Sequence, residues 1–341
     1  METTFTYDRR VSGKSFVGRK AELELLEQAF QNGHNVAIYE SAKSGKASLL
    51  KHCLWSLSVK GFKYQSFELS LLSIRSEKDF LKRFAALFNF SYDPSQVPDD
   101  NLILGLFSIA KTKAAMTGVR VIIILSEFQN IYKIERGEKL LKLMEKAASG
   151  QEVSWVWSGS QVNGMKEIFE KKKFFFKNYV RVKLQPISLK EAENFLIKGF
   201  LVSGKVIESQ QADYVYEILQ GNIYYLQHFA AICDGLSRGF ITEAVVEESI
   251  LSLLNIHEAR FISTIYDLTA FQINLLKAVL DGESRFSSSE VIKKYSLNSS
   301  ANVKRLKEAL CKKEIMTFDE KDKAHILDPL FEYWLRKYYF I

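Results

Sequence analysis

The chain has 341 residues, of which 47% are hydrophobic and 26% are charged. This composition is typical of globular domains with a sizeable core and argues against long disordered segments. No apolar signal segment opens the sequence, and no apolar run approaches the roughly 20 residues of a membrane helix. We therefore expect a cytoplasmic protein that does not contact a membrane. The net charge of +7 permits a nucleotide or nucleic-acid partner without requiring one.

The cysteines and histidines give no sign of a metal site. Cys53, Cys233 and Cys311 lie far apart and lack CxxC spacing, which argues against both a zinc site and a disulfide framework. The five histidines show no spacing typical of metal ligands or of a catalytic triad. We expect no metal site built from these residues.

The first half of the chain alternates predicted helices and strands. The spacing of Leu23, Leu26 and Phe30 predicts a helix that begins near Arg19. Strands are predicted over residues 35–39, 62–69, 119–125, 154–157 and 180–184, and helices over 47–59, 77–88, 100–115, 137–148 and 165–173. This alternation predicts an α/β fold with one doubly wound parallel sheet, whose ligands bind beyond the C-terminal ends of the strands.

The strand over residues 35–39 leads directly into a loop with most of a phosphate-binding pattern. The intact pattern is a glycine, four free residues, Gly-Lys and then Ser or Thr, because backbone amides wrap the phosphates, the lysine reaches them and the hydroxyl holds Mg²⁺. Gly45 and Lys46 are present, but Glu40 replaces the first glycine and Ala47 replaces the hydroxyl residue. The candidate nucleotide-binding residues of the loop are Glu40, Ser41, Ala42, Lys43, Ser44, Gly45, Lys46, Ala47 and Ser48.

From residue 188 onward the hydrophobic periodicity is mainly helical. Helices are predicted over residues 189–200, 209–219, 224–233 and 242–254, and then over 269–280, 288–295 and 300–313. An apparent hairpin follows, with strands over residues 315–318 and 325–327. Three helices followed by a two-stranded wing predict a C-terminal winged helix-turn-helix domain.

The helix predicted over residues 300–313 is the candidate recognition helix of that domain. Its basic residues Lys304, Arg305 and Lys307 are possible DNA-binding residues that would contact phosphates, and Asn302 is the main candidate for a base contact. Three alternatives remain open. The domain can instead pack against the lid, it can dock a protein partner, or its lysine-rich helix face can simply be solvated.

Taken in order, these motifs resemble the AAA+ P-loop ATPases, in particular the prokaryotic STAND-like and archaeal-type ATPase family, with a layout like that of an origin initiator. The motifs are FVGR at residues 16–19, the loop at 40–47, IIILSEFQ at 122–129, SGS at 158–160, QGNI at 220–223 and DPLFEYW at 328–334. The resemblance implies a nucleotide-binding core over residues 1–186, a helical lid over 187–257 and a winged helix domain over 258–341.

The resemblance also implies roles for single residues. The FVGR turn lies near the adenine in this family, which adds Val17 and Gly18 to the nucleotide-binding candidates, and Ser160 takes the position of a nucleotide sensor. At the end of the third strand the family has an Asp that coordinates Mg²⁺ and a catalytic Glu. The residues here are Ser126 and Glu127, so Glu127 is the catalytic candidate.

Both positions that would hold the metal are therefore altered. Ala47 has no hydroxyl and Ser126 has no charge, and Ser48 cannot substitute because one residue along a helix turns the side chain by about 100°. The sequence also has Lys177 roughly where related sequences carry an arginine before the fifth strand.

Nucleotide binding is a separate question, because it depends mainly on the loop amides and on Lys46. We expect ATP or ADP to bind, Mg²⁺ binding to be doubtful and hydrolysis to be weakened or lost. The nucleotide would then set the arrangement of the lid and the winged helix. One alternative is a scaffold without nucleotide, in which Lys46 pairs with Glu40 or Glu127 and the winged helix binds DNA or protein. Another is a slow but true ATPase.

Overall fold

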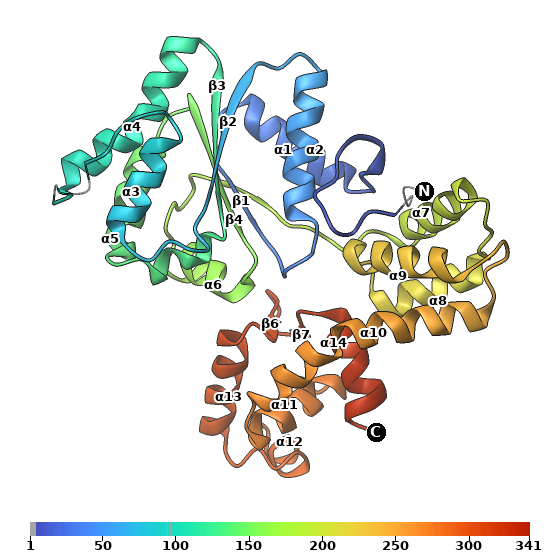
Figure 1. Cartoon of the computed structure of the whole chain (residues 1–341). Coiled ribbons are helices and arrows are strands. Elements are labelled where there is room, and N and C mark those ends of the chain that lie inside the picture. Colours follow the sequence, from blue (N-terminus) through green and yellow to red (C-terminus); the bar gives the residue numbers. More distant parts are fainter. Residues whose placement is uncertain (1–4, 94, 96) are drawn as a thin grey trace. The chain divides into compact units, whose positions relative to one another are not determined.

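The computed structural model describes residues 5–93, 95 and 97–341. It divides into two compact units (Figure 1). Arg10–Gln185 form the first unit, and Pro186–Ile341 form the second together with the described residues that precede Arg10. Within the described part of the chain, no helix is long and apolar enough to cross a membrane.

A five-stranded parallel sheet with the order β2-β3-β4-β1-β5 forms the centre of the first unit. The register pairs Ser70 with Ser126 and Tyr39 with Gly159, so the C-terminal ends of four strands meet at one edge. Polar residues that follow these strands are therefore brought together. The strands are β1 (Val36–Tyr39), β2 (Tyr64–Ser70), β3 (Arg120–Ser126), β4 (Val153–Gly159) and β5 (Val180–Val182).

Helices cover both faces of this sheet (Figure 1). One face packs against α1 (Lys20–Gln31) and α2 (Lys46–Val59). The other packs against α3 (Glu77–Ala86), α4 (Asp100–Thr117) and α5 (Gly137–Ala147). Where the sequence predicts one helix over residues 165–173, the structure has α6 (Val162–Lys166) followed by a π-helical turn over Glu167–Lys171.

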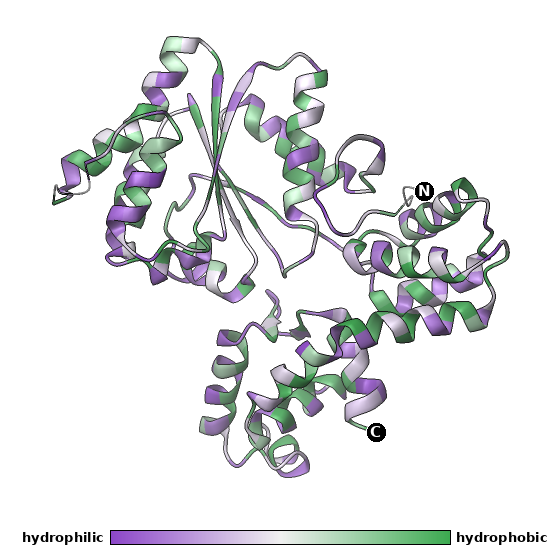
Figure 2. Ribbon diagram, in the orientation of Figure 1, coloured by the Kyte–Doolittle hydropathy of each residue, from purple (hydrophilic) through white to green (hydrophobic). Residues whose placement is uncertain are grey.

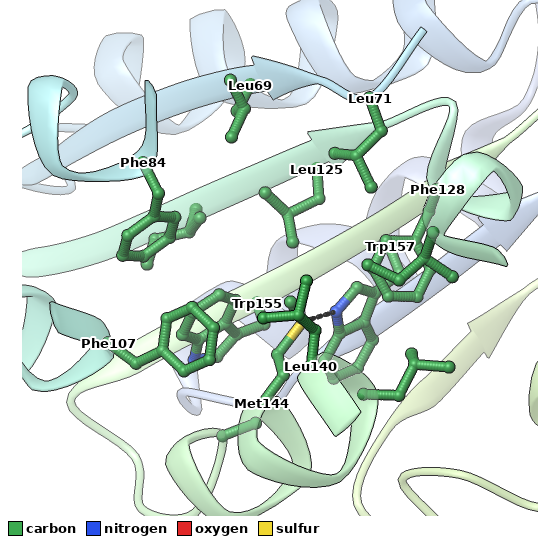
Figure 3. Packing of buried hydrophobic residues seen from close by; sticks show 14 of the residues in the cluster. Leu69, Leu71, Phe84, Phe107, Leu125, Phe128, Leu140, Met144, Trp155 and Trp157 are labelled. Atoms are coloured by element: carbon green, nitrogen blue, oxygen red, sulfur yellow. Dashed lines mark hydrogen bonds between the residues drawn. The ribbon is translucent and has the colours of Figure 1, made fainter. Parts of the chain in front are cut away.

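The face that packs against α3, α4 and α5 holds an aromatic core around two tryptophans of β4 (Figure 3). The Trp155 ring stacks on Phe84 with the ring centroids 5.8 Å apart. Trp157 donates a hydrogen bond from Nε1 to the Met144 sulfur at 3.4 Å, which satisfies its buried N–H. Apolar side chains are buried on both faces of the sheet. The strand ends that carry the candidate site are therefore held in place by a closely packed core.

The second unit begins with four helices, α7 (Leu189–Val202), α8 (Ser209–Leu219), α9 (Ile223–Leu236) and α10 (Glu243–Tyr266). The last of these is much longer than the predicted helix over residues 242–254. No glycine or proline interrupts residues 255–266, and His257 and Phe261 continue the buried face of the helix. The boundary predicted between residues 257 and 258 therefore falls inside α10.

Three helices and a two-stranded wing follow, as predicted. They are α11 (Ala270–Leu280), α12 (Ser289–Lys294) and α13 (Ser300–Lys312), followed by the antiparallel strands β6 (Met316–Phe318) and β7 (Ala324–Ile326). Figure 2 shows hydrophilic and hydrophobic residues alternating along α13, which buries Val303, Leu306 and Leu310. The chain closes with α14 (Pro329–Trp334) and a π-helical turn over Leu335–Tyr339.

The carboxylate of Asp328 fastens this closing segment to the preceding helices. Asp328 Oδ1 accepts hydrogen bonds from the backbone N–H groups of Leu330 and Phe331, at 3.0 and 3.2 Å, and so caps α14. Asp328 Oδ2 accepts from the Tyr225 hydroxyl of α9 at 2.9 Å and from the Arg260 guanidinium of α10 at 2.8 Å. The aspartate that opens the DPLFEYW motif therefore joins three helices.

Candidate nucleotide-binding site

The loop between β1 and α2 turns sharply before the helix begins. Lys43 and Gly45 have φ values of 65° and 94°, in the left-handed region that favours glycine. Gly45 is the N-cap of α2, and no described side chain caps the helix there. The first N–H groups of α2 therefore point out of the helix end without an intrahelical acceptor, which is the arrangement that binds anions.

Lys46 lies inside this loop and is 9% exposed. Its ammonium donates to the backbone oxygens of Glu40 and Ser41, both at 2.8 Å, and to the Ser44 hydroxyl at 3.2 Å. Burial lowers the pKa of Lys46 to about 8, an effect that the charges of Glu127 and Glu40 oppose. The hydrogen bonds of Lys46 thus run to the loop itself, whereas the scaffold alternative has Lys46 paired with a carboxylate.

The carboxylate of Glu40, at the position of the missing glycine, is paired with Arg181 of β5. The Arg181 guanidinium lies 3.3 Å from Glu40 Oε1, donates to Tyr39 O at 2.7 Å and stacks on the Tyr39 ring, 3.2 Å from its centroid. Burial raises the pKa of Glu40, and the Arg181 charge opposes that shift. Arg181 is four residues beyond Lys177, the cation indicated by the sequence, whose ammonium instead lies 5.4 Å from the Phe176 ring centroid.

The FVGR turn reaches the loop through Arg19, which the sequence interpretation did not place in the site. Arg19 is buried, and its guanidinium donates to Ser44 O at 2.8 Å and to Gln185 O at 2.7 Å. Gly18, just before it, has a φ of 64° that lets the chain turn into α1. The structure thus brings the Val17–Gly18 turn beside the phosphate-binding loop.

Glu127 and Ser160, predicted from separate motifs, are in direct contact. Glu127 Oε2 accepts hydrogen bonds from the Ser160 hydroxyl at 2.6 Å and from Gln129 Nε2 at 2.7 Å. Glu127 itself adopts the left-handed conformation with a φ of 52°, an uncommon one for a residue with a side chain. Gln129 was not singled out in the sequence, although the same motif contains it.

A cavity of about 410 Å³ adjoins the loop between α2 and the ends of β2, β3 and β4. Ala47 and Ser126, the two altered metal-binding positions, both line it, as do Lys46 and Glu127. Ser48 does not, and its hydroxyl accepts a hydrogen bond from Val11 N at 3.2 Å. Among the described residues, no group of three or more His, Cys, Asp or Glu side chains could hold a metal ion. The other lining residues are Arg10, Leu50, Lys51, Leu54, Glu68, Ser70, Leu72, Ile124 and Ser158.

The three candidate DNA-binding residues of α13 differ in their surroundings. Lys304 and Arg305 are exposed. The Lys307 ammonium lies 4.3 Å from the Phe318 ring centroid and 3.6 Å from the Asp322 carboxylate, so it packs against the wing. Asn302, the candidate for a base contact, donates from its side-chain amide to Leu297 O at 3.0 Å.

Comparisons with known proteins identify the fold. A family described as a probable winged helix domain matches residues 259–337, whereas no curated protein matches the chain. The structure is similar to that of a Walker-type ATPase of Pyrococcus abyssi, with 16% identity, a TM-score of 0.74 and coverage of 98% of this chain and 100% of that one. It is also similar to the ORC2 protein of Aeropyrum pernix in its ADP form, with 13% identity, a TM-score of 0.62 and coverage of 95% and 93%.

These likenesses confirm the predicted fold class. The chain has the α/β P-loop fold of an AAA+ ATPase core, with a doubly wound parallel sheet, followed by helices and a C-terminal winged helix domain. The finer assignment to the STAND-like branch, the exact division into three domains and the roles of the site residues stay predictions.

Proposed function

We propose that this chain is a regulatory protein that binds ATP or ADP through the loop over residues 40–47 and hydrolyses ATP slowly or not at all. In this proposal the nucleotide sets the arrangement of the lid helices and the winged helix. The observation that carries it is the state of Lys46, whose buried ammonium is held by two loop carbonyls and a hydroxyl beside an open helix N-terminus.

A phosphate oxygen can take the place of the oxygens that now accept hydrogen bonds from the Lys46 ammonium. Lys46 donates to neutral oxygens, and a charged phosphate oxygen is a stronger acceptor for an ammonium than a carbonyl. The N–H groups at the start of α2 and the helix dipole favour the same anion. Among the similar structures, the ORC2 protein of Aeropyrum pernix is described in an ADP form, which supports a nucleotide as the ligand.

The residues around the cavity do not fit a Mg²⁺ ion. In P-loop enzymes the metal bridges the β- and γ-phosphates and neutralises the charge that develops there. Ala47 offers a methyl group, and Ser126 offers a neutral hydroxyl. The Glu127 oxygen that faces Ser160 already accepts two hydrogen bonds. Weak hydrolysis follows from this donor set, because electrostatic positioning supplies most of phosphoryl-transfer catalysis.

A thermal-shift measurement with the full-length protein tests nucleotide binding. We expect ATP and ADP to raise the melting temperature, and Lys46→Ala to abolish the shift because the buried ammonium is lost. We also expect affinity to fall as the pH rises above about 8, where Lys46 of the free protein loses its proton.

The matched control for this experiment is Lys63→Ala. Lys63 is exposed and precedes β2, at the opposite end of the strands from the loop, so its loss changes the net charge equally. A shift of the same size in Lys46→Ala and wild type would contradict the proposal, as would no shift at millimolar nucleotide concentration.

The second candidate function is DNA binding by the winged helix. It is favoured by the exposure of Lys304 and Arg305 on α13, the helix in the recognition position of the domain. DNA binding is compatible with nucleotide binding and also with a scaffold that holds no nucleotide.

A further inference from the structure

The chain that precedes α1 is held along one face of α2. Lys51 Nζ donates to Arg10 O at 3.0 Å, and Val11 N donates to the Ser48 hydroxyl at 3.2 Å. Gly13 N lies 3.0 Å from His52 Nδ1, to which it donates. Ser48, Lys51 and His52 are three and four residues apart on the helix, so they present one continuous face to this segment.

This attachment places the Arg10 side chain at the cavity beside the phosphate-binding loop. Arg10 lines the cavity together with Lys46, Ala47 and Ser126. Its guanidinium lies 2.9 Å from Glu68 Oε2 of β2, and Glu68 lines the same cavity. Arg10 thus pairs with Glu68 in the cavity that the two altered metal-binding positions also line.

The charges that line this cavity suit an anion better than a cation. Three basic side chains, Arg10, Lys46 and Lys51, face two carboxylates, Glu68 and Glu127. A divalent metal would be repelled by the three basic groups and would find no oxygen ligand on Ala47. A polyphosphate would instead meet an arginine, whose planar guanidinium can donate two parallel hydrogen bonds to phosphate oxygens.

We propose that Arg10 supplies to a bound nucleotide the positive charge that Mg²⁺ supplies in P-loop ATPases, so that ATP and ADP bind without a metal. This inference rests on the proposed nucleotide binding, and it adds Arg10 as the residue that balances the charge of the phosphates. Arg10 exchanges its Glu68 carboxylate for a phosphate oxygen, while Lys51 and Ser48 keep the segment on α2.

The test measures the affinity of the full-length protein for ATP and ADP by calorimetry, once in EDTA and once in excess Mg²⁺. We expect equal affinities in the two conditions. Arg10→Gln should weaken binding in EDTA about tenfold or more, which is the effect of losing one charge-assisted hydrogen bond. Arg9→Gln is the matched control, because Arg9 carries the same charge but does not line the cavity.

Two further variants separate a ligand contact from a structural role. Arg10→Lys should recover part of the affinity because it keeps the charge. Glu68→Gln should tighten binding, because it frees Arg10 and removes a negative charge from the cavity; a merely structural Arg10–Glu68 pair predicts weaker binding instead. The inference is overturned if wild-type binding requires Mg²⁺ or if Arg10→Gln binds as Arg9→Gln does. Wild-type protein that binds no nucleotide in either condition overturns the proposed function as well.

Discussion

At position 40 a carboxylate stands where a phosphate-binding loop has glycine, and its negative charge is balanced within the fold. Arg181 contacts the Glu40 carboxylate, the Tyr39 carbonyl and the Tyr39 ring at once. Both charged side chains are largely buried: that of Arg181 is 17% exposed and that of Glu40 is 28% exposed. Glu40 is therefore held toward β5 and adds little repulsion to an anion in the loop.

We expect Arg181→Gln to lower the free energy of unfolding by about 2 kcal/mol, because it leaves a buried carboxylate without its ion pair. The penalty should shrink as the pH falls through the pKa of Glu40, since a protonated Glu40 no longer needs the guanidinium. Burial raises that pKa above 4.5, so the change should begin above this pH. Urea unfolding of both proteins across this range is the measurement. A penalty that does not change with pH would contradict the ion pair. If Arg181→Gln costs no stability in a Glu40→Gln background, the ion pair is supported.

Arg181 and Arg10, two of the residues missed by sequence reasoning, reach the site through topology. The loop motif and the Glu127–Ser160 pair could be located because each follows a predicted strand at a fixed spacing. Arg181 reaches Glu40 only because β5 pairs with β1, with Ala37 opposite Arg181. Arg10 reaches the cavity only because its segment lies on α2. Strand order and loop docking are not encoded in local periodicity, so neither contact could be predicted.

Among the elements, α13 carries the case for DNA binding, and its basic residues fall into two groups. Lys304 and Arg305 are exposed, whereas Lys307 contacts Phe318 and Asp322 of the wing. The lengths of the elements were predicted less well than their order. The end of α10 was missed because the predicted helix stops at residue 254, whereas the buried face of the helix continues through Phe261.

We expect the full-length protein to shift duplex DNA at low salt, and the double variant Lys304→Gln/Arg305→Gln to weaken the complex. Each lost phosphate contact should reduce the slope of log affinity against log salt by about 0.9. Fluorescence anisotropy over a salt series measures both quantities. Lys307→Gln serves as the comparison, since it should lower the stability of the wing with little change in the salt slope. Equal slopes for wild type and the double variant would remove this surface as a DNA site.

On the scale of the whole molecule, the chain consists of two compact units, and it passes from one to the other at Arg10 and again at Pro186. Nucleotide can regulate such a molecule only if it binds one arrangement of the units more tightly than another. The arrangement of the units can be measured with labels on introduced cysteines, because two of the native thiols are protected from labelling. Cys53 and Cys233 are buried and their pKa values are raised by that burial, so they react slowly with labelling reagents.

We expect ADP or ATP to change the distance distribution between labels on Ala115→Cys and Lys293→Cys, one exposed site in each unit, in a Cys311→Ser background. Lys46→Ala should remove the change, because it removes nucleotide binding. Pulsed electron spin resonance measures the distribution. If wild type binds nucleotide with an unaltered distribution, nucleotide does not set the arrangement of the units.

The pairing of Glu40 with Arg181 also determines what a substitution at position 40 would do. A Glu40→Gly substitution would leave the Arg181 guanidinium over the Tyr39 ring without its carboxylate, at the entrance of the phosphate-binding loop. The loop entrance would then carry one more unbalanced positive charge than it does with Glu40, with a stronger hold on any bound phosphate. The effect of a substitution at position 40 therefore depends on the residue at position 181.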